Sequence, residues 1–172
     1  MDSRQPIESR PGLIEIEAHQ WHHIVYTRTP ELDTKIWYDG ECLFEGKSQD
    51  LPYAHNALIF GAAMLKEYRN HAAITLDRVI LSGRSWTPDE IAEESRFTGS
   101  LPEDRFTIKV WEMETASSEA FAVSKHFDIS SKPTPTAGVS DLALSFDGDD
   151  DLLRSFAAIP KGTVTLGFHF RM

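Results

Sequence analysis

The chain has 172 residues, of which 41% are hydrophobic, enough to form one domain of ordinary size or two small ones. Its net charge is −10 at pH 7, and basic residues do not cluster, so we expect no nucleic-acid partner. The single cysteine, Cys42, excludes an internal disulfide. No apolar run approaches the ~20 residues of a membrane helix, and none occurs at the N-terminus, so we predict neither a membrane segment nor a signal peptide in this sequence.

Alternating apolar and polar residues predict strands in the first quarter of the chain. Residues 13–16 and 21–26 alternate with period two, which gives a strand two unlike faces. Residues 35–41 form a further predicted strand that ends at Asp39-Gly40. This dipeptide is typical of a two-residue hairpin, because a type I′ turn needs positive φ at both central positions. Residues 42–44 then belong to the returning strand.

The middle of the chain contains the one clear helix signal. Residues 57–62 and 75–82 are predicted strands, the first ending at Gly61. Thr87, Pro88 and Glu90 form a T-x-x-E capping box with proline in the first turn, so we expect a short helix that ends near Arg96.

The last third of the chain is again rich in predicted strands. They cover residues 106–113, 120–129, 142–148 and 163–170, although residues 114–123 could also be helical. Many short strands and one short helix predict an all-β fold, an antiparallel β-sandwich. A competing α/β fold would need helices of 10–15 residues between strands, and the sequence contains at most one or two.

An ordered series of short motifs resembles the laminin-G-like and concanavalin-A-like lectin/glucanase jelly roll. The motifs are Trp21-His22-His23, Trp37-Tyr38-Asp39-Gly40, Leu58-Ile59-Phe60-Gly61, Leu76-Asp77-Arg78-Val79 and Arg84-Ser85-Trp86-Thr87-Pro88-Asp89-Glu90-Ile91. The resemblance implies a jelly-roll sandwich and an extracellular or cell-surface location.

The order of the motifs is reversed relative to that family. Residues 142–153 resemble the opening strand of the fold, yet they follow the motifs of its closing half. We therefore divide the chain into residues 1–129, with the closing half and extra strands, a Ser/Thr/Pro-rich linker at 130–138, and residues 139–172 with the opening strands. The two parts form one domain if the chain is a circular permutant, and two if it is a slice through tandem repeats.

The aromatic and histidine residues near the N-terminus are the candidate ligand-binding residues. Trp37 is the best platform for a sugar ring, and Tyr38 and His23 complete the predicted ligand-binding site. His19 and His23 share a strand face with Trp21, but zinc needs three or four converging ligands. Because no cysteine or second histidine pair is spaced to join them, we interpret the Trp-His-His strand as structural.

The acidic turn at residues 147–151 is the predicted cation site. Calcium prefers six to eight oxygen ligands, which we assign to Asp147, Asp149, Asp150 and Asp77. The calcium would be structural, and the alternative is a solvated acidic turn.

Catalysis is not expected, because glycoside hydrolysis needs two carboxylates that face each other and residues 89–94 and 112–119 lack the required spacing. We therefore predict a non-catalytic binding module that recognises carbohydrate or a protein surface within a larger adhesin-like or enzyme-associated protein. The alternative is a structural or assembly module, compatible with a homo-oligomer, that pairs through open sheet edges.

Overall fold

A computed structural model describes seven segments of the chain. They are residues 16–48, 57–63, 70–96, 104–113, 133–139, 142–156 and 159–172. The predicted strand at 120–129 and most of that at 13–16 lie outside these residues.

Antiparallel strands dominate the described residues, which contain a single short helix. In chain order the elements are β1 (Trp21–Arg28), β2 (Asp33–Tyr38), β3 (Glu41–Lys47), β4 (Ala57–Phe60), β5 (Ala62–Ala63), β6 (Asn70–His71), β7 (Ala73–Ser82), α1 (Pro88–Ser95), β8 (Thr107–Trp111), β9 (Thr134–Ala137), β10 (Leu142–Asp147), β11 (Leu153–Phe156) and β12 (Val164–Arg171). The predicted all-β class with one short helix is confirmed.

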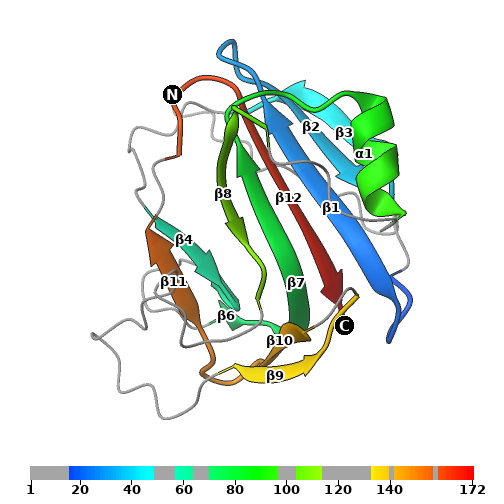
Figure 1. The fold of residues 1–172 in the computed structure, drawn as a ribbon, viewed down its shortest axis with the longest axis vertical. Coiled ribbons are helices and arrows are strands. Elements are labelled where there is room, and N and C mark those ends of the chain that lie inside the picture. The colour runs from blue at the N-terminus through cyan, green and yellow to red at the C-terminus, as the bar shows by residue number, and fades with distance from the viewer. Residues whose placement is uncertain are drawn as a thin grey trace, which may run out of the picture.

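One large antiparallel sheet contains strands from both ends of the chain (Figure 1). Its order is β3-β2-β1-β12-β7-β10-β9, and β8 pairs with the part of β7 that β10 leaves free. The last strand, β12, lies between β1 and β7. Strands β10 and β12, from the last part of the chain, therefore share one sheet with β1, β2, β3, β7 and β8.

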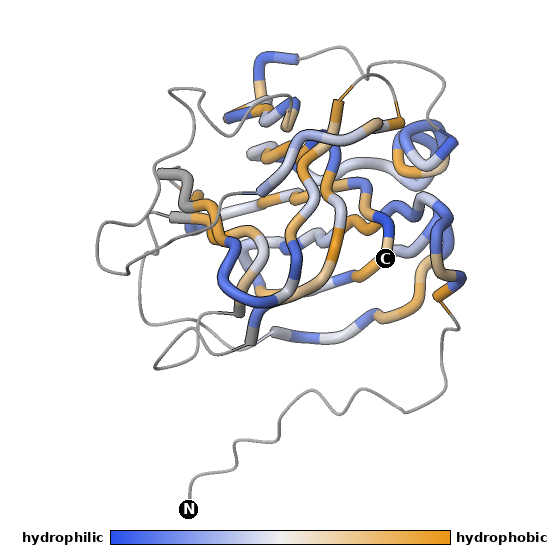
Figure 2. The backbone as a smooth tube through the Cα atoms, turned by 90° about the horizontal axis from the view of Figure 1, so that it is seen from below, coloured by the Kyte–Doolittle hydropathy of each residue, from blue (hydrophilic) through white to orange (hydrophobic). Residues whose placement is uncertain are grey.

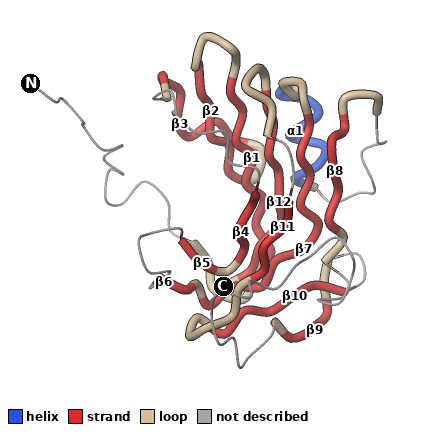
Figure 3. Tube along the Cα trace, turned by 90° about the vertical axis from the view of Figure 1, so that its left-hand side faces the viewer, coloured by secondary structure: helices blue, strands red, loops and turns tan. Residues whose placement is uncertain are grey.

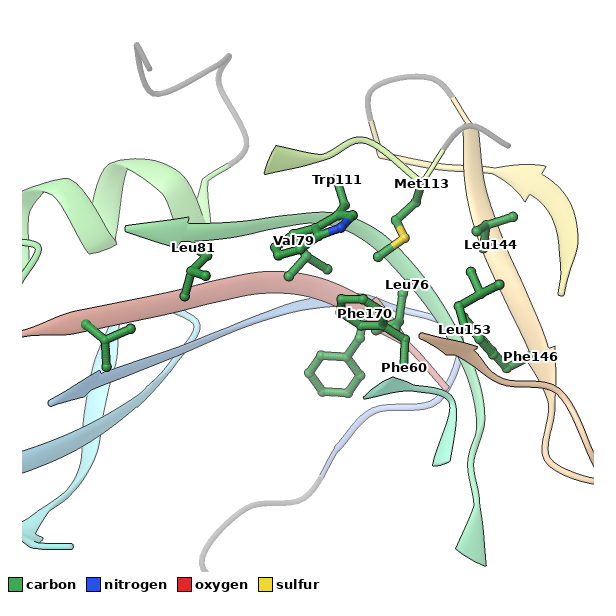
Figure 4. Close-up of a cluster of buried hydrophobic side chains, with 11 residues drawn as sticks. Phe60, Leu76, Val79, Leu81, Trp111, Met113, Leu144, Phe146, Leu153 and Phe170 are labelled. Carbon is green, nitrogen blue, oxygen red and sulfur yellow. The ribbon is translucent and has the colours of Figure 1, made fainter. Parts of the chain in front are cut away.

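The two sides of the sheet are packed differently. The β4–β11 pair lies on one side and α1 on the other (Figures 1 and 3). The larger core lies under β4 and β11 and joins Phe60 and Leu153 to Val79, Trp111 and Phe170 (Figure 4). The smaller core lies under α1 and is made of Val25, Ile80, Trp86 and Ile91. β1 and β7 have side chains in both cores, and β12, which lies between them, places His169 against α1. These three strands therefore form the middle of the molecule.

The hydrophobic pattern explains how the strands bury two faces. Hydropathy changes repeatedly between apolar and polar along the strands (Figure 2), as expected where neighbouring side chains point to opposite sides. In β7, by contrast, residues from Thr75 to Ser82 are all buried, because both faces of this strand are covered.

The two strongest local signals are confirmed. Asp39 has φ of 47° and Gly40 φ of 87°, and these residues join β2 to β3 in an antiparallel hairpin. Thr87 accepts from the backbone N–H of Glu90, and the Glu90 carboxylate accepts from the N–H of Thr87, so the capping box is complete.

Part of the predicted linker is a strand. Residues 134–137 form β9, which pairs with β10 at the edge of the sheet. Pro135 is compatible with an edge strand because one side of such a strand needs no ladder hydrogen bond. Among the described residues, no helix is long and apolar enough to cross a membrane.

Candidate functional sites

The three predicted ligand-binding residues lie on two different sides of the sheet. Trp37 is half-buried and packs against the smaller core on the side of α1. Tyr38 is half-buried and packs against the larger core. His23 is buried beneath α1. The structure thus does not bring Trp37 and Tyr38 together, because adjacent strand residues point in opposite directions.

Tyr38 on β2 forms a polar group with His22, the residue before His23 on β1. Nδ1 of His22 lies 2.6 Å from the Tyr38 hydroxyl and 2.9 Å from a carboxylate oxygen of Asp39. Its Nε2 lies 3.1 Å from the Glu17 carbonyl oxygen. Burial opposes protonation, but the bonds to Asp39 and Glu17 outweigh it and raise the pKa of His22. Asp39 also accepts from the His23 N–H at 2.7 Å, so this group fixes the hairpin turn to β1.

His23 itself belongs to a second polar group that the sequence did not predict. His169 lies directly opposite on β12, and Glu94 reaches the same place from the last turn of α1. One ligand atom of each residue lies within 4.8 Å of the others. The side chains are almost fully buried, with exposures of 2% for His23, 3% for Glu94 and 2% for His169.

Two further charged side chains, Arg78 and Asp77, are buried around this His23–Glu94–His169 cluster. Arg78 lies 4.0 Å from the Glu94 carboxylate and occupies a bulge in β7, where its φ is 36°. Asp77 faces His169 across the strand pair, and one of its carboxylate oxygens accepts from the Val139 N–H. Burial lowers the pKa of His23 to about 4, and burial together with the neighbouring His23 lowers that of His169 to about 3. Both imidazoles are therefore neutral at pH 7.

Sequence reasoning missed this cluster because its members come from three distant parts of the chain. Glu94 looks like one of several acids on a polar helix, and His169 belongs to the final strand. One signal was available: His169 interrupts the apolar run Val164–Phe170 at a position where a buried side chain is expected.

The acidic turn brings three carboxylates close together. Carboxylate oxygens of Asp147, Asp150 and Asp151 lie within 4.8 Å of one another, with Asp151 buried. Asp149 is not one of these three, and its backbone N–H donates to the Asp147 carboxylate. Asp151 also accepts a hydrogen bond from the Asp147 N–H. Asp77 lies near His169, whereas Asp147 pairs with Ala73 at the far end of β7, so Asp77 does not join the turn.

A further surface, here called the aromatic face, lies on the side of the sheet opposite α1. Register places its side chains in two rows across β3, β2, β1 and β12. One row is Phe44, Ile36, Tyr26 and Leu166, and the other is Tyr38, Ile24 and Phe168. All seven are half-buried, while the next residues in the same rows, Leu81 and Val79 on β7, are buried.

Comparison with known proteins adds no relative. No family model matches this chain, and no curated protein or solved structure matches it.

Proposed function

We propose that the protein is a non-catalytic binding module and that the aromatic face is its ligand-binding surface. The observation that carries this proposal is the gradient of burial along the two rows. Side chains on β7 are buried, but those on β1, β2 and β3 keep part of their surface accessible. Accessible rings that a rigid sheet holds in place bind a ligand with little loss of conformational entropy.

Carbohydrate is the first ligand class for this face. Tyr26 and Phe44 lie in one row two strands apart, a spacing of about 10 Å. Aromatic rings spaced in this way offer two flat apolar surfaces on which the C–H groups of successive sugar rings can pack.

A protein surface is the second ligand class. Aliphatic Ile24 and Ile36 fill the space between the rings, so the face has a continuous apolar centre. Such a centre, with aromatic residues around it, is typical of protein interfaces.

Assembly through open sheet edges, the alternative function, receives less support from the edges of β3 and β9. The β3 edge carries Glu41, Glu45 and Lys47, and the β9 edge is short and contains Pro135. Charged residues and proline on an edge strand oppose pairing with another chain.

A glycan array with the wild-type chain and three variants tests the proposal. Tyr26→Ala and Phe44→Ala should each weaken glycan binding at least about tenfold, because each removes a ring from the face. Glu45→Gln is the matched control, since Glu45 follows Phe44 on β3, is exposed and points to the other side.

If no glycan binds, carbohydrate recognition is rejected, and a photo-crosslinking residue at position 44 then tests the protein class. A specific crosslink that Tyr26→Ala abolishes would support a protein ligand. Crosslinks unaffected by Tyr26→Ala would contradict the assignment of this face.

A further inference from the structure

We infer that His23, Glu94 and His169 form a buried structural site for a divalent transition metal of the zinc class. The inference does not depend on the aromatic face, because the two sites lie on opposite sides of the sheet. Two imidazoles and one carboxylate are a ligand set that zinc uses in proteins.

The unpartnered nitrogen of His23 is the first argument. His23 is 2% exposed, yet its Nδ1 makes no hydrogen bond within the described structure. A buried polar atom without a partner costs free energy. In the tautomer that carries the ring proton on Nε2, the Nδ1 of His23 has a lone pair that meets no donor among the described residues. A metal ion among the three side chains would use that lone pair.

The tautomer of His169 is the second argument. Its Nε2 lies 3.2 Å from the Glu94 carbonyl oxygen, and because a carbonyl only accepts, Nε2 carries the proton. The lone pair of His169 is therefore on Nδ1. A histidine that donates one ring N–H to a backbone carbonyl and offers the other nitrogen to a metal is the usual arrangement around bound zinc.

The position of Glu94 is the third argument. Its carboxylate is 3% exposed, and one of its oxygens lies within 4.8 Å of a ring nitrogen of each histidine. A carboxylate oxygen in this place can complete the ligand set of the two imidazoles.

The distances require a small rearrangement on binding. Zinc–ligand bonds of about 2.0–2.2 Å place ligand atoms roughly 3.4 Å apart, whereas here they lie within 4.8 Å of one another. The two imidazoles are stacked, with centroids 4.4 Å apart and planes at 21°, so their rings would tilt toward the ion. Because Glu94 lies on α1 and the histidines on β1 and β12, the ion would fasten the helix to the two strands.

Zinc titration of the whole chain after treatment with a chelator tests the site. We expect calorimetry to detect one equivalent of zinc, cobalt(II) to give the visible absorption of a nitrogen- and oxygen-liganded ion, and zinc to raise the melting temperature by about 5 °C or more. His23→Leu and Glu94→Gln should weaken zinc binding at least about 100-fold and abolish the thermal shift.

Two features of the experiment separate a metal site from a structural polar cluster. His23→Leu removes the unpartnered nitrogen, so without zinc the variant should melt no lower than the stripped wild type, which shows that it folds. His19→Asn is the matched control, because His19 is exposed at a turn with φ of 69° that asparagine tolerates, and it should bind zinc as the wild type does.

Three outcomes would overturn the inference. They are no zinc binding by the stripped wild type, unchanged binding by folded His23→Leu, and loss of binding in His19→Asn. The second would place any bound zinc elsewhere, for example at the acidic turn.

Discussion

At the scale of single residues, backbone conformation and close packing decide which positions tolerate change. Gly61 has φ of 83° and lies against the larger core. A Cβ atom at this position would lie 2.2 Å from Cδ1 of Phe146 and 2.8 Å from the Asp151 carbonyl oxygen. Glycine is thus required here both by φ and by space.

Gly61→Ala should lower the free energy of unfolding by about 2–4 kcal/mol, because it combines a strained φ with overpacking of the core. Urea denaturation followed by circular dichroism measures the loss. Gly162→Ala is the control, since a Cβ there would meet no atom within 4 Å, and it should change stability by less than about 0.5 kcal/mol. Equal effects of the two substitutions would contradict the described packing around Gly61.

At the scale of elements, the start of α1 is held by an ion-pair group as well as by its capping box. Arg84 donates to both carboxylate oxygens of Glu90, at 2.8 and 2.6 Å, and to Asp104 at 2.7 Å. The hydrogen bonds from Arg84 lower the pKa of Glu90 to about 2. Burial opposes this shift, and the hydrogen bond from the Thr87 N–H adds to it. Glu90 thereby links the helix to the loop before it and, through Arg84, to the residues before β8.

Glu90→Gln should lower stability by about 1 kcal/mol at pH 7, because glutamine keeps a capping acceptor but loses the ion pair. The folded-state pKa lies below the unfolded value of 4.5, so the stabilisation is complete above pH 4.5 and is lost as the pH falls toward 2. Urea midpoints at pH 7, 5 and 3 should therefore show wild type and variant converging in acid. A difference independent of pH would exclude an ionic contribution, and Glu93→Gln, exposed on the same helix, is the control.

At the scale of the whole molecule, β12 connects parts that are far apart in the sequence. It pairs with β1 on one side and β7 on the other. It contributes residues to the larger core and His169 to the His23–Glu94–His169 cluster under α1. The two layers are therefore expected to unfold together.

Phe170→Ala tests this coupling, because Phe170 is buried in the larger core, away from α1. The substitution should lower the free energy of unfolding by about 3 kcal/mol. It should lower the urea midpoint equally when unfolding is followed by tryptophan fluorescence and by the circular dichroism of the strands. Trp86, under α1, contributes to the fluorescence signal. Separate midpoints for the two signals would mean that the two layers are independent units. Met172→Ala, at an exposed position two residues further, should leave both midpoints unchanged.

The sequence by itself determined the class of the fold and its most local elements. Alternation of apolar residues predicts strands, and Asp39-Gly40 and Thr87–Glu90 predict the hairpin and the helix start, because each signal acts within a few residues. Only the tertiary structure decided which strands are neighbours: β12 enters the sheet beside β1, and part of the expected linker becomes β9. The tertiary structure also placed Glu94 and His169 beside His23 and kept Asp77 away from the acidic turn. Strand pairing and helix packing bring such residues together, and spacing along the chain does not reveal these contacts.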